Sequence, residues 1–323
     1  MSDLRIDSSA RLIGKLRLGK NVYVAQGTII RSINDSIAMG NSSWVLENSV
    51  LVGTPEHPLK VGSKTVFGHK CIAIGAEIGD LCEIGNCVMI LPGSKIGNMC
   101  IFGEGTIIPE GTVIPDESVV VGRPGRIIRN LTDEDKKMIS RMRSNDISLS
   151  TYLENIVVNE PKEGEIMENI YEYNGNFPSI SETAFIYDSA EITGDVVIGD
   201  NSVIASGVRI IGNSHGPVRI GNNVQILENS VLHLLPDNEL IIDDNVIIGP
   251  GCMIHGTTIG SNTIIESGSI ICDYSKLGKN TLVKSGTLVK QRSIYSDNEI
   301  LEGYPAKNVG MNSENLKKPS WAI

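Results

Sequence analysis

From Ile72 to Val119 the chain reads IAIGAE IGDLCE IGNCVM ILPGSK IGNMCI FGEGTI IPEGTV IPDESV, eight consecutive blocks of six residues. Each block opens with an aliphatic residue or Phe and carries a small residue at its fifth position. A period of six fits neither an amphipathic helix nor the two-residue alternation of an ordinary strand. It fits a short strand followed by a corner, in which the opening residue points inward and Gly, Asn or Asp takes the corner conformation with positive φ. The stretch therefore predicts a solenoid of parallel strands stacked about 4.8 Å apart.

The second half of the chain has the same period, for example IGDNSV at 198–203, ILENSV at 226–231 and VKSGTL at 283–288. The pattern resembles the hexapeptide-repeat superfamily, in which three hexapeptides form one triangular coil. The resemblance implies an all-β fold made of left-handed parallel β-helices. It says little about function, because that fold is used for many chemistries.

The two halves are copies of each other. The segment ENSVL occurs at 47–51 and again at 228–232, and the same offset of 181 relates GRPGR at 122–126 to GYPAK at 303–307. Between the copies the repeat is lost, and Thr132 followed by three acidic residues predicts the start of a helix over 133–155. We therefore expect two β-helix domains joined by an α-helical linker. Their expected bounds are 1–130 for the first β-helix, 131–176 for the helical linker and exposed connector, 177–311 for the second β-helix and 312–323 for a flexible tail.

Composition limits the classes of function. The formal net charge of -10 argues against a nucleic-acid or anionic-membrane surface. We expect no transmembrane span and no signal peptide, because the chain has no long apolar run and begins with a short charged segment. The six cysteines include no C-x-x-C pair, which favours reduced thiols and a cytoplasmic protein.

The chain has only five histidines, and three of them stand at informative places. His233 ends a Val-Leu-His segment, His255 lies in Met-Ile-His-Gly, and His69 lies in Phe-Gly-His-Lys. This spacing is similar to the arrangement by which gamma-class carbonic anhydrases place three zinc ligands. Each half departs from it in a complementary way: the second half has Pro250 at the middle position, whereas the first half has Val52 and Ile74 at the outer two.

The repeat itself places two of these side chains. His233 and His255 each follow the third inward residue of successive coils, so we expect them to stack on one face about one strand spacing apart. His69 follows the second inward residue of its coil and should lie on another face.

In the resembled family the sites lie at trimer interfaces, with two histidines from one subunit and one from its neighbour. The resemblance therefore implies a homotrimer and a split site of His69, His233 and His255 that binds zinc or another divalent transition metal. His215, in a Gly-Asn-Ser-His-Gly-Pro loop, is an alternative third ligand, and exposed histidines without a metal are the structural alternative.

The resemblance also implies carbon dioxide hydration by a metal-bound water or hydroxide. The accessory residues depart from the family pattern: its Arg-x-Asp is Arg31 with Ile33 in the first half, and its Gln is replaced by Leu46 and Leu227. The carboxylate that follows is kept as Glu47 and Glu228. Both are candidates for proton transfer or for holding an interface, and for Glu47 a structural pairing with Arg31 is the favoured alternative. The prediction is thus a metal-dependent lyase or hydrolase that acts on a small-molecule substrate, carbon dioxide or another.

Two other functions fit the same repeat. In a coenzyme A-dependent acyltransferase with acetyl-CoA as cofactor, His57 in the loop TPEHPL would be the general base, since it resembles the loop histidine of sugar acetyltransferases. In a non-catalytic trimeric scaffold, neither metal nor small ligand would bind.

Overall fold

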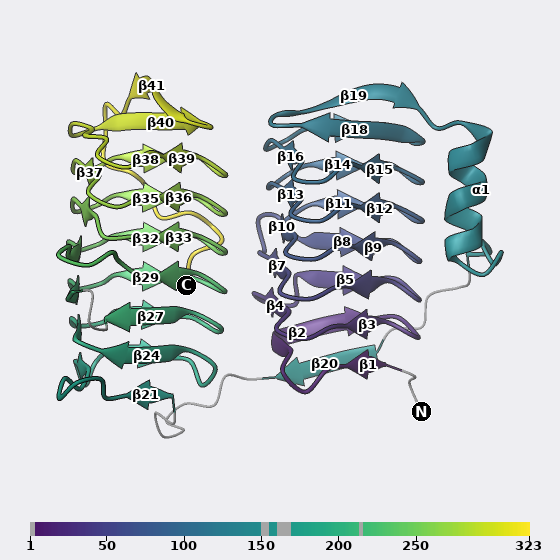
Figure 1. Cartoon of the computed structure of the whole chain (residues 1–323). Coiled ribbons are helices and arrows are strands. Elements are labelled where there is room, and N and C mark those ends of the chain that lie inside the picture. The colour runs from purple at the N-terminus through teal and green to yellow at the C-terminus, as the bar shows by residue number, and fades with distance from the viewer. Residues whose placement is uncertain (1–3, 150–154, 160–168, 213–215) are drawn as a thin grey trace. The chain divides into compact units, whose positions relative to one another are not determined.

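The computed structural model describes residues 4–149, 155–159, 169–212 and 216–323, with the backbone alone for 155–159. The chain divides into two compact units, residues 1–161 and 162–323. Each unit is a left-handed β-solenoid, a stack of coils with three strand-bearing faces (Figure 1). We number the faces I, II and III so that equivalent faces of the two units share a number.

In the first unit the short strands of successive coils pair in parallel on each face. Face I contains β1 (Arg5–Ile6), β3 (Tyr23–Val24), β6 (Trp44–Val45), β9 (Val66–Phe67), β12 (Glu83–Ile84), β15 (Ile101–Phe102) and β18 (Ser118–Gly122). Face II contains β4 (Ile29–Ser32), β7 (Val50–Gly53), β10 (Ile72–Ile74), β13 (Met89–Ile90) and β16 (Ile107–Ile108). Face III contains β5 (Ile37–Met39), β8 (Leu59–Val61), β11 (Glu77–Ile78), β14 (Lys95–Ile96) and β17 (Val113–Ile114). The long strand β2 (Arg11–Leu18) belongs to both faces II and III, and β20 (Asn155–Asn159) pairs with it in antiparallel fashion.

The second unit repeats this plan. Face I contains β23 (Phe185–Ile186), β26 (Val203–Ile204), β29 (Gln225–Ile226), β32 (Ile247–Ile248), β35 (Ile264–Ile265), β38 (Leu282–Val283) and β40 (Glu299–Gly303). Face II contains β21 (Ile170–Tyr171), β24 (Glu191–Gly194), β27 (Arg209–Gly212), β30 (Val231–Leu232), β33 (Met253–Ile254), β36 (Ile270–Ile271) and β39 (Leu288–Val289). Face III contains β22 (Ser179–Ile180), β25 (Val196–Ile198), β28 (Val218–Ile220), β31 (Leu240–Ile242), β34 (Thr258–Ile259) and β37 (Lys276–Leu277).

The inward residues form the core that the repeat predicts. In the first unit Val45, Phe67 and Ile84 lie on neighbouring strands of face I and are buried in one cluster. The corners use the left-handed backbone region, as at the equivalent positions Asn48 and Asn229, with φ of 58° and 55°. Asn is favoured there because its short polar side chain tolerates this conformation better than other non-Gly residues do.

Both solenoids end in a hairpin on face I. In the first unit β18 turns back into β19 (Gly125–Asn130), and in the second β40 turns back into β41 (Ala306–Met311). After β19 comes α1 (Asp133–Met142), which Thr132 caps through a hydrogen bond from the Asp135 backbone. No helix in the described part of the chain is long and apolar enough to cross a membrane.

The helix is shorter than the sequence predicts. It ends at Met142 instead of reaching residue 155, because Ser144 and Asn145 adopt positive φ and turn the chain. Arg143 then donates through Nε to the Lys64 carbonyl, 2.9 Å away, and the Arg143 guanidinium lies 2.5 Å from Glu83 on face I. Half of the expected connector, residues 161–168, lies outside the described residues, and β21 already belongs to the second solenoid.

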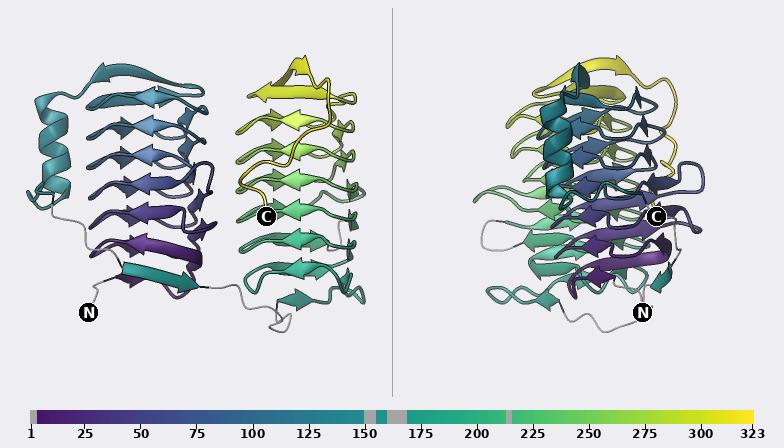
Figure 2. Two further views of the ribbon diagram at one scale, coloured as in Figure 1. Left: turned by 180° about the vertical axis from the view of Figure 1, so that it is seen from behind. Right: turned by 90° about the vertical axis from the view of Figure 1, so that its right-hand side faces the viewer.

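The last twelve residues also differ from the expected flexible tail. Trp321 and Ala322 are buried, and the backbone N–H of Ile323 donates to the Gln225 side chain on face I of the second unit, 2.9 Å away. Figure 2 shows this segment in yellow, running along the second unit. The tail thus covers the same face of its unit that α1 covers in the first.

Candidate metal site

Two histidines meet on face II of the second unit. His233 follows β30 and His255 follows β33, and these strands pair in register, Leu232 opposite Ile254. The His233 backbone N–H donates to the Ile254 carbonyl at 3.0 Å, so the two residues occupy the same position in adjacent coils. Their ring centroids are 6.0 Å apart and the ring planes make an angle of 86°. The prediction that His233 and His255 stack on one face is confirmed.

A buried carboxylate fixes the orientation of His255. Asp273 lies one coil further on, and its Oδ2 is 3.0 Å from His255 Nδ1. Its other oxygen, Oδ1, accepts hydrogen bonds from the backbone N–H groups of Gly256 at 3.1 Å and Leu235 at 3.0 Å, and from Asn238 Nδ2 at 3.2 Å. Because an ionised carboxylate only accepts, the His255 proton belongs on Nδ1, which leaves the Nε2 lone pair for a ligand.

The first unit contains a second histidine that lies beside a carboxylate. His69 Nδ1 lies 2.7 Å from Glu47 Oε2, and about half of the His69 side chain is exposed (53%). Glu47 occupies the equivalent position one coil earlier, since Lys70 donates its backbone N–H to the Glu47 carbonyl. Unlike the Asp273–His255 pair, this contact does not have hydrogen-bond geometry, since Glu47 Oε2 has no hydrogen-bond partner, so it does not fix the tautomer of His69. The equivalent residues of the second unit are Glu228, which is buried, and Pro250.

The two units differ systematically along face II. In the second unit the residues that follow the inward residue of β30, β33, β36 and β39 are His233, His255, Cys272 and Lys290. The residues at the equivalent positions of the first unit are apolar or Pro: Val52, Ile74, Leu91 and Pro109. Metal-ligating groups on this face therefore belong to the second unit alone.

The three predicted ligands are divided between the units, with His69 in the first and His233 and His255 in the second. Among the described residues no group of three His, Cys, Asp or Glu side chains is arranged to hold a metal ion. His215, the alternative third ligand, lies outside the described residues. His57 lies on the loop between β7 and β8, where its backbone N–H donates to Thr54 Oγ1 at 2.9 Å.

The cysteines are thiols, as expected, and all six are free. Four are buried, and burial raises the pKa of Cys71 and of Cys252 to about 12. Cys272, beside the histidine pair, also has a raised pKa, because burial and then the Asp273 charge disfavour its thiolate. It is therefore a neutral thiol at physiological pH.

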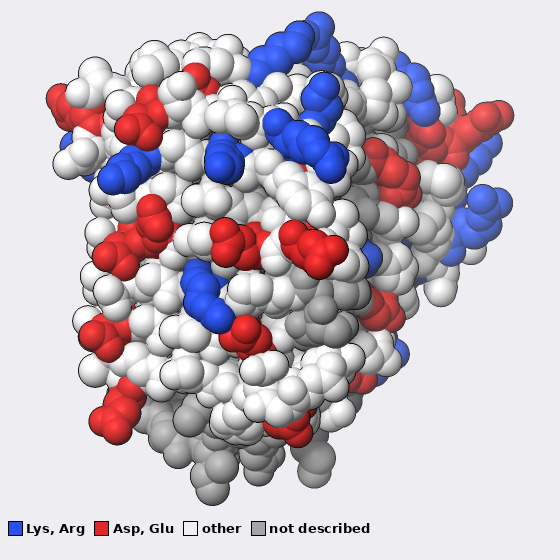
Figure 3. Space-filling model, turned by 60° about the vertical axis from the view of Figure 1, so that its left-hand side comes forward, with Lys and Arg blue, Asp and Glu red and all other residues white. Residues whose placement is uncertain are grey.

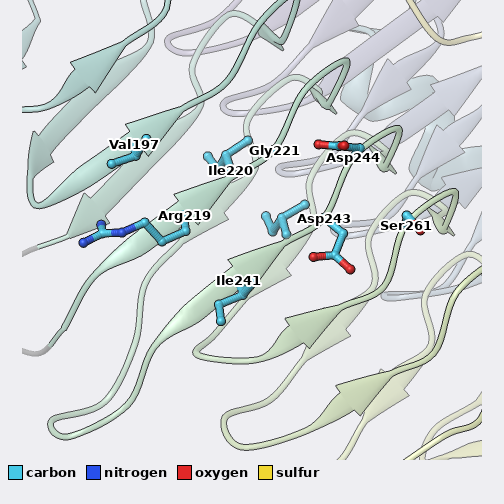
Figure 4. Close-up of a pocket in the computed structure, with 9 residues that line it drawn as sticks. Val197, Arg219, Ile220, Gly221, Ile241, Asp243, Asp244 and Ser261 are labelled. Carbon is cyan, nitrogen blue, oxygen red and sulfur yellow. The ribbon is translucent and has the colours of Figure 1, made fainter.

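A shallow depression of about 370 Å³ lies on face III of the second unit. Arg219, Asp243, Asp244 and Ser261 are among the residues that line it (Figure 4). The Arg219 guanidinium is already paired with Asp195, at 2.7 and 3.2 Å. With its one lining cation neutralised and no histidine in its lining, this depression is a weaker candidate than the histidine pair.

Comparisons with known proteins agree with this fold. The family model "Bacterial transferase hexapeptide (six repeats)" matches residues 177–212 and 240–273, and "Hexapeptide repeat of succinyl-transferase" matches 58–92. The chain is thus a hexapeptide-repeat protein. A carbonic anhydrase from Geobacillus kaustophilus is 44% identical over 140 residues, which are 43% of this chain and 76% of that protein. The chain belongs to the gamma-carbonic-anhydrase-like family of hexapeptide-repeat proteins.

Other relatives carry transferase names. The uncharacterized transferase YtoA of Bacillus subtilis is 46% identical over 93 residues, 29% of this chain and 54% of that protein. Among solved structures, a hexapeptide transferase family protein from Anaplasma phagocytophilum is 32% identical, covers 46% of this chain and 87% of its own, and has a TM-score of 0.44.

Sequence reasoning missed Asp273 and the pairing of Glu47 with His69. The position of Asp273 follows from coil arithmetic, since it stands 18 residues, or three hexapeptides, after His255. The signal was an acidic residue directly beyond a histidine row, at a position where the first unit has Pro92.

Proposed function

We propose that this protein is a metal-dependent enzyme related to gamma-class carbonic anhydrase, in which His233 and His255 hold a zinc or similar divalent ion. The observation that carries the proposal is the orientation of His255 by Asp273. Metal-binding histidines almost always donate their second ring N–H to a carboxylate or carbonyl, which fixes the tautomer and raises the basicity of the ligating nitrogen.

The histidine pair fits such an ion. Two imidazoles that share one tetrahedral metal, with bonds of about 2.0–2.1 Å, have ring centroids roughly 5 Å apart. The 6.0 Å separation of His233 and His255 is longer by about 1 Å, a gap that rotation of the two side chains would close on metal binding. When bound, the ion supplies Lewis acidity and a nucleophile from water at neutral pH.

The third ligand in this proposal is His69 of a neighbouring copy of the chain. His69 is about half exposed, and its Nδ1 lies 2.7 Å from Glu47 Oε2, a contact between charged groups without hydrogen-bond geometry. The first half thus keeps the ligand His69 that the second half lacks, and the second half keeps His233 and His255 that the first half lacks. This division is expected of one site assembled from two chains. The protein is then an oligomer, and a trimer is the form we propose. A monomer in size-exclusion chromatography with light scattering would exclude the shared site.

The carboxylates take separate roles in the proposal. Glu47 is a positioning residue for His69, and Glu228 stays a candidate for proton transfer. The lost accessory residues at positions 33, 46 and 227 favour a substrate other than carbon dioxide. Strong carbon dioxide hydration in a stopped-flow assay, abolished in His255→Ala, would show instead that the ancestral substrate is retained.

Metal content tests the proposal directly. Untagged protein purified without chelators is analysed by mass spectrometry as wild type, His69→Ala, His255→Ala and His57→Ala. We expect metal in the wild type and in His57→Ala, and its loss in the other two variants. Metal retained in His69→Ala would confine the site to the second unit, and no metal in the wild type would refute the proposal.

The alternative is a coenzyme A-dependent acyltransferase with acetyl-CoA as its cofactor. The transferase names of YtoA and of the Anaplasma protein favour it, and His57 is 37% exposed on its loop, where it could reach an acceptor. Isothermal titration calorimetry with acetyl-CoA decides: micromolar binding promotes this alternative. A protein that binds neither metal nor coenzyme would be the trimeric scaffold.

A further inference from the structure

The row of side chains that begins with the histidine pair continues past it. His233, His255, Cys272 and Lys290 stand in four successive coils, and each of the first three donates its backbone N–H to the coil above, at 3.0, 2.9 and 3.0 Å. Since the inward residue precedes each of them, all four side chains leave the same side of the solenoid. We call these four residues the polar row.

A second row runs beside the polar row and is apolar. It consists of the residues that precede the inward residues of the same strands: Val231, Met253, Ile270 and Leu288. Met253 is the most accessible of them, with 42% of its surface exposed. Next to the neutral thiol of Cys272, this row offers hydrocarbon contact between the histidines and Lys290.

The loop 234–239 lies on the other side of the polar row. Asp273 holds it through Leu235 and Asn238, and Tyr274 Oη donates to the Pro236 carbonyl at 3.3 Å. Above Tyr274 the Arg292 guanidinium lies 4.8 Å from the ring centroid. The far end of the row thus carries two cations, Lys290 and Arg292, and among the described residues neither forms an ion pair with a carboxylate.

The balance of charged residues in the second unit changes from acidic to basic in the direction from His233 to Lys290. Residues 169–273 contain thirteen Asp and Glu but two Lys and Arg, whereas residues 274–323 contain eight Lys and Arg and four Asp and Glu. In Figure 3 the basic side chains gather in the upper part of the visible face and the acidic ones predominate below. An anionic ligand on this unit is therefore attracted toward Lys290 and away from the coils before His233.

We propose that the substrate carries an anionic group at the end opposite to its reacting group, that Lys290 binds this group, and that a short hydrocarbon spacer lies along Met253, Ile270 and Cys272. Lys290 is two coils from His255, so their Cα atoms are about 10 Å apart. If the Lys290 side chain extends toward the histidines, the distance between its ammonium group and the metal site matches the length of a small dicarboxylate. The first unit has Pro109 and Gly111 in place of the two cations, so selectivity belongs to the second unit alone. This inference rests on the proposed metal site.

Cobalt-loaded protein tests it without an activity assay. The visible spectrum of the bound cobalt reports ligands that reach the metal, and acetate, succinate and adipate serve as probes. We expect a dicarboxylate to bind at least tenfold more tightly than acetate, and Lys290→Gln to remove this preference while leaving acetate binding unchanged. Lys276→Gln, an exposed lysine on face III, is the matched control and should keep the preference.

The outcomes separate the two proposals. Protein that takes up no cobalt overturns the metal site itself. Protein that binds cobalt and acetate but shows no dicarboxylate preference, or keeps it in Lys290→Gln, overturns the role of Lys290 and leaves the metal site standing. Binding of the dicarboxylate to metal-free protein with equal affinity would likewise overturn the inference, because the second carboxylate would then have no metal to reach.

Discussion

Replacing Asp273 by Asn separates the orientation of His255 from the stability of the fold. Oδ1 of Asp273 accepts the three hydrogen bonds that tie down Gly256, Leu235 and Asn238, and Oδ2 faces His255 Nδ1. An Asn side chain keeps the first oxygen and puts an NH₂ group at the second position. It cannot rotate by 180° without setting its NH₂ group against three donors, so it presents a donor to His255.

His255 then has to change its tautomer. With a donor opposite Nδ1, the imidazole places its proton on Nε2, and the lone pair that the metal needs is lost. Loss of such an orienting partner typically costs 10- to 100-fold in metal affinity, or about 1.4–2.7 kcal/mol. The free energy of unfolding of metal-free protein should fall by only about 1 kcal/mol, because the hydrogen bond to His255 is reversed and loses its charged acceptor but is not removed.

Asp273→Ala provides the contrast. It removes the acceptor of the Leu235 and Gly256 backbone N–H groups, whereas Asn238 Nδ2 keeps its hydrogen bond to the Gly256 carbonyl. We expect a loss of about 2–5 kcal/mol in urea unfolding, together with the loss of metal affinity. Asp243→Asn, on face III, is the matched control and should change neither quantity. Metal affinity is measured by competition with a chromophoric chelator, and the tautomer by nitrogen chemical shifts of His255 in metal-free protein. A His255 that keeps its proton on Nδ1 in Asp273→Asn, or an unchanged metal affinity, would refute the reasoning.

Three further predictions concern the rest of the chain. Trp321→Ala should lower the free energy of unfolding by about 3 kcal/mol in urea titration, because the ring is buried; an unchanged midpoint would mean that the tail does not dock in solution. Hydrogen bonds from Ser148 and Lys64 lower the pKa of Asp146 to about 2, below its usual 3.8. The stability that this carboxylate contributes is therefore present above pH 3.8 and is lost as the pH falls toward 2. In a plot of the free energy of unfolding against pH, Asp146→Asn should show a smaller decrease in this range. A variant with the same acid sensitivity as the wild type would contradict the assignment. Cys87 is the exposed cysteine, so iodoacetamide should alkylate it first in native protein by peptide mass spectrometry; faster labelling of a buried cysteine would argue against the burial described.

The coils were predictable from the sequence because one rule is repeated many times. An aliphatic residue every sixth position, as at Ile78, Ile84 and Ile90, leaves one way to bury all of them. The same register places His233 and His255 at the same position in adjacent coils. After the first hairpin the start of α1 was predictable from Thr132 and the acidic residues that follow it, but where these segments end and dock was not, since they follow no repeat. The length of α1 depends on turn residues such as Asn145, and the docking of Trp321 depends on a surface that only the folded coils create.

The candidate site was also predictable only in part. The sequence positions of His233 and His255 were enough to predict that they lie on one face. The contacts of Asp273 with His255 and of Glu47 with His69 depend instead on side-chain conformations between coils. Sequence spacing gives Cα positions along the solenoid but not rotamers. An acidic residue one coil beyond a ligand histidine is nevertheless a signal that can be searched for in other hexapeptide-repeat chains.

The central claim, a metal shared between His233 and His255 of one chain and His69 of another, can be tested by complementation. Chains carrying His69→Ala and chains carrying His255→Ala are purified separately, and also as mixed oligomers selected through two different tags. The account predicts no metal in either variant alone and recovery of metal in the mixed oligomer, where an intact pair can meet an intact His69. Metal in His69→Ala alone, or none in mixed oligomers whose assembly is confirmed by light scattering, would contradict it.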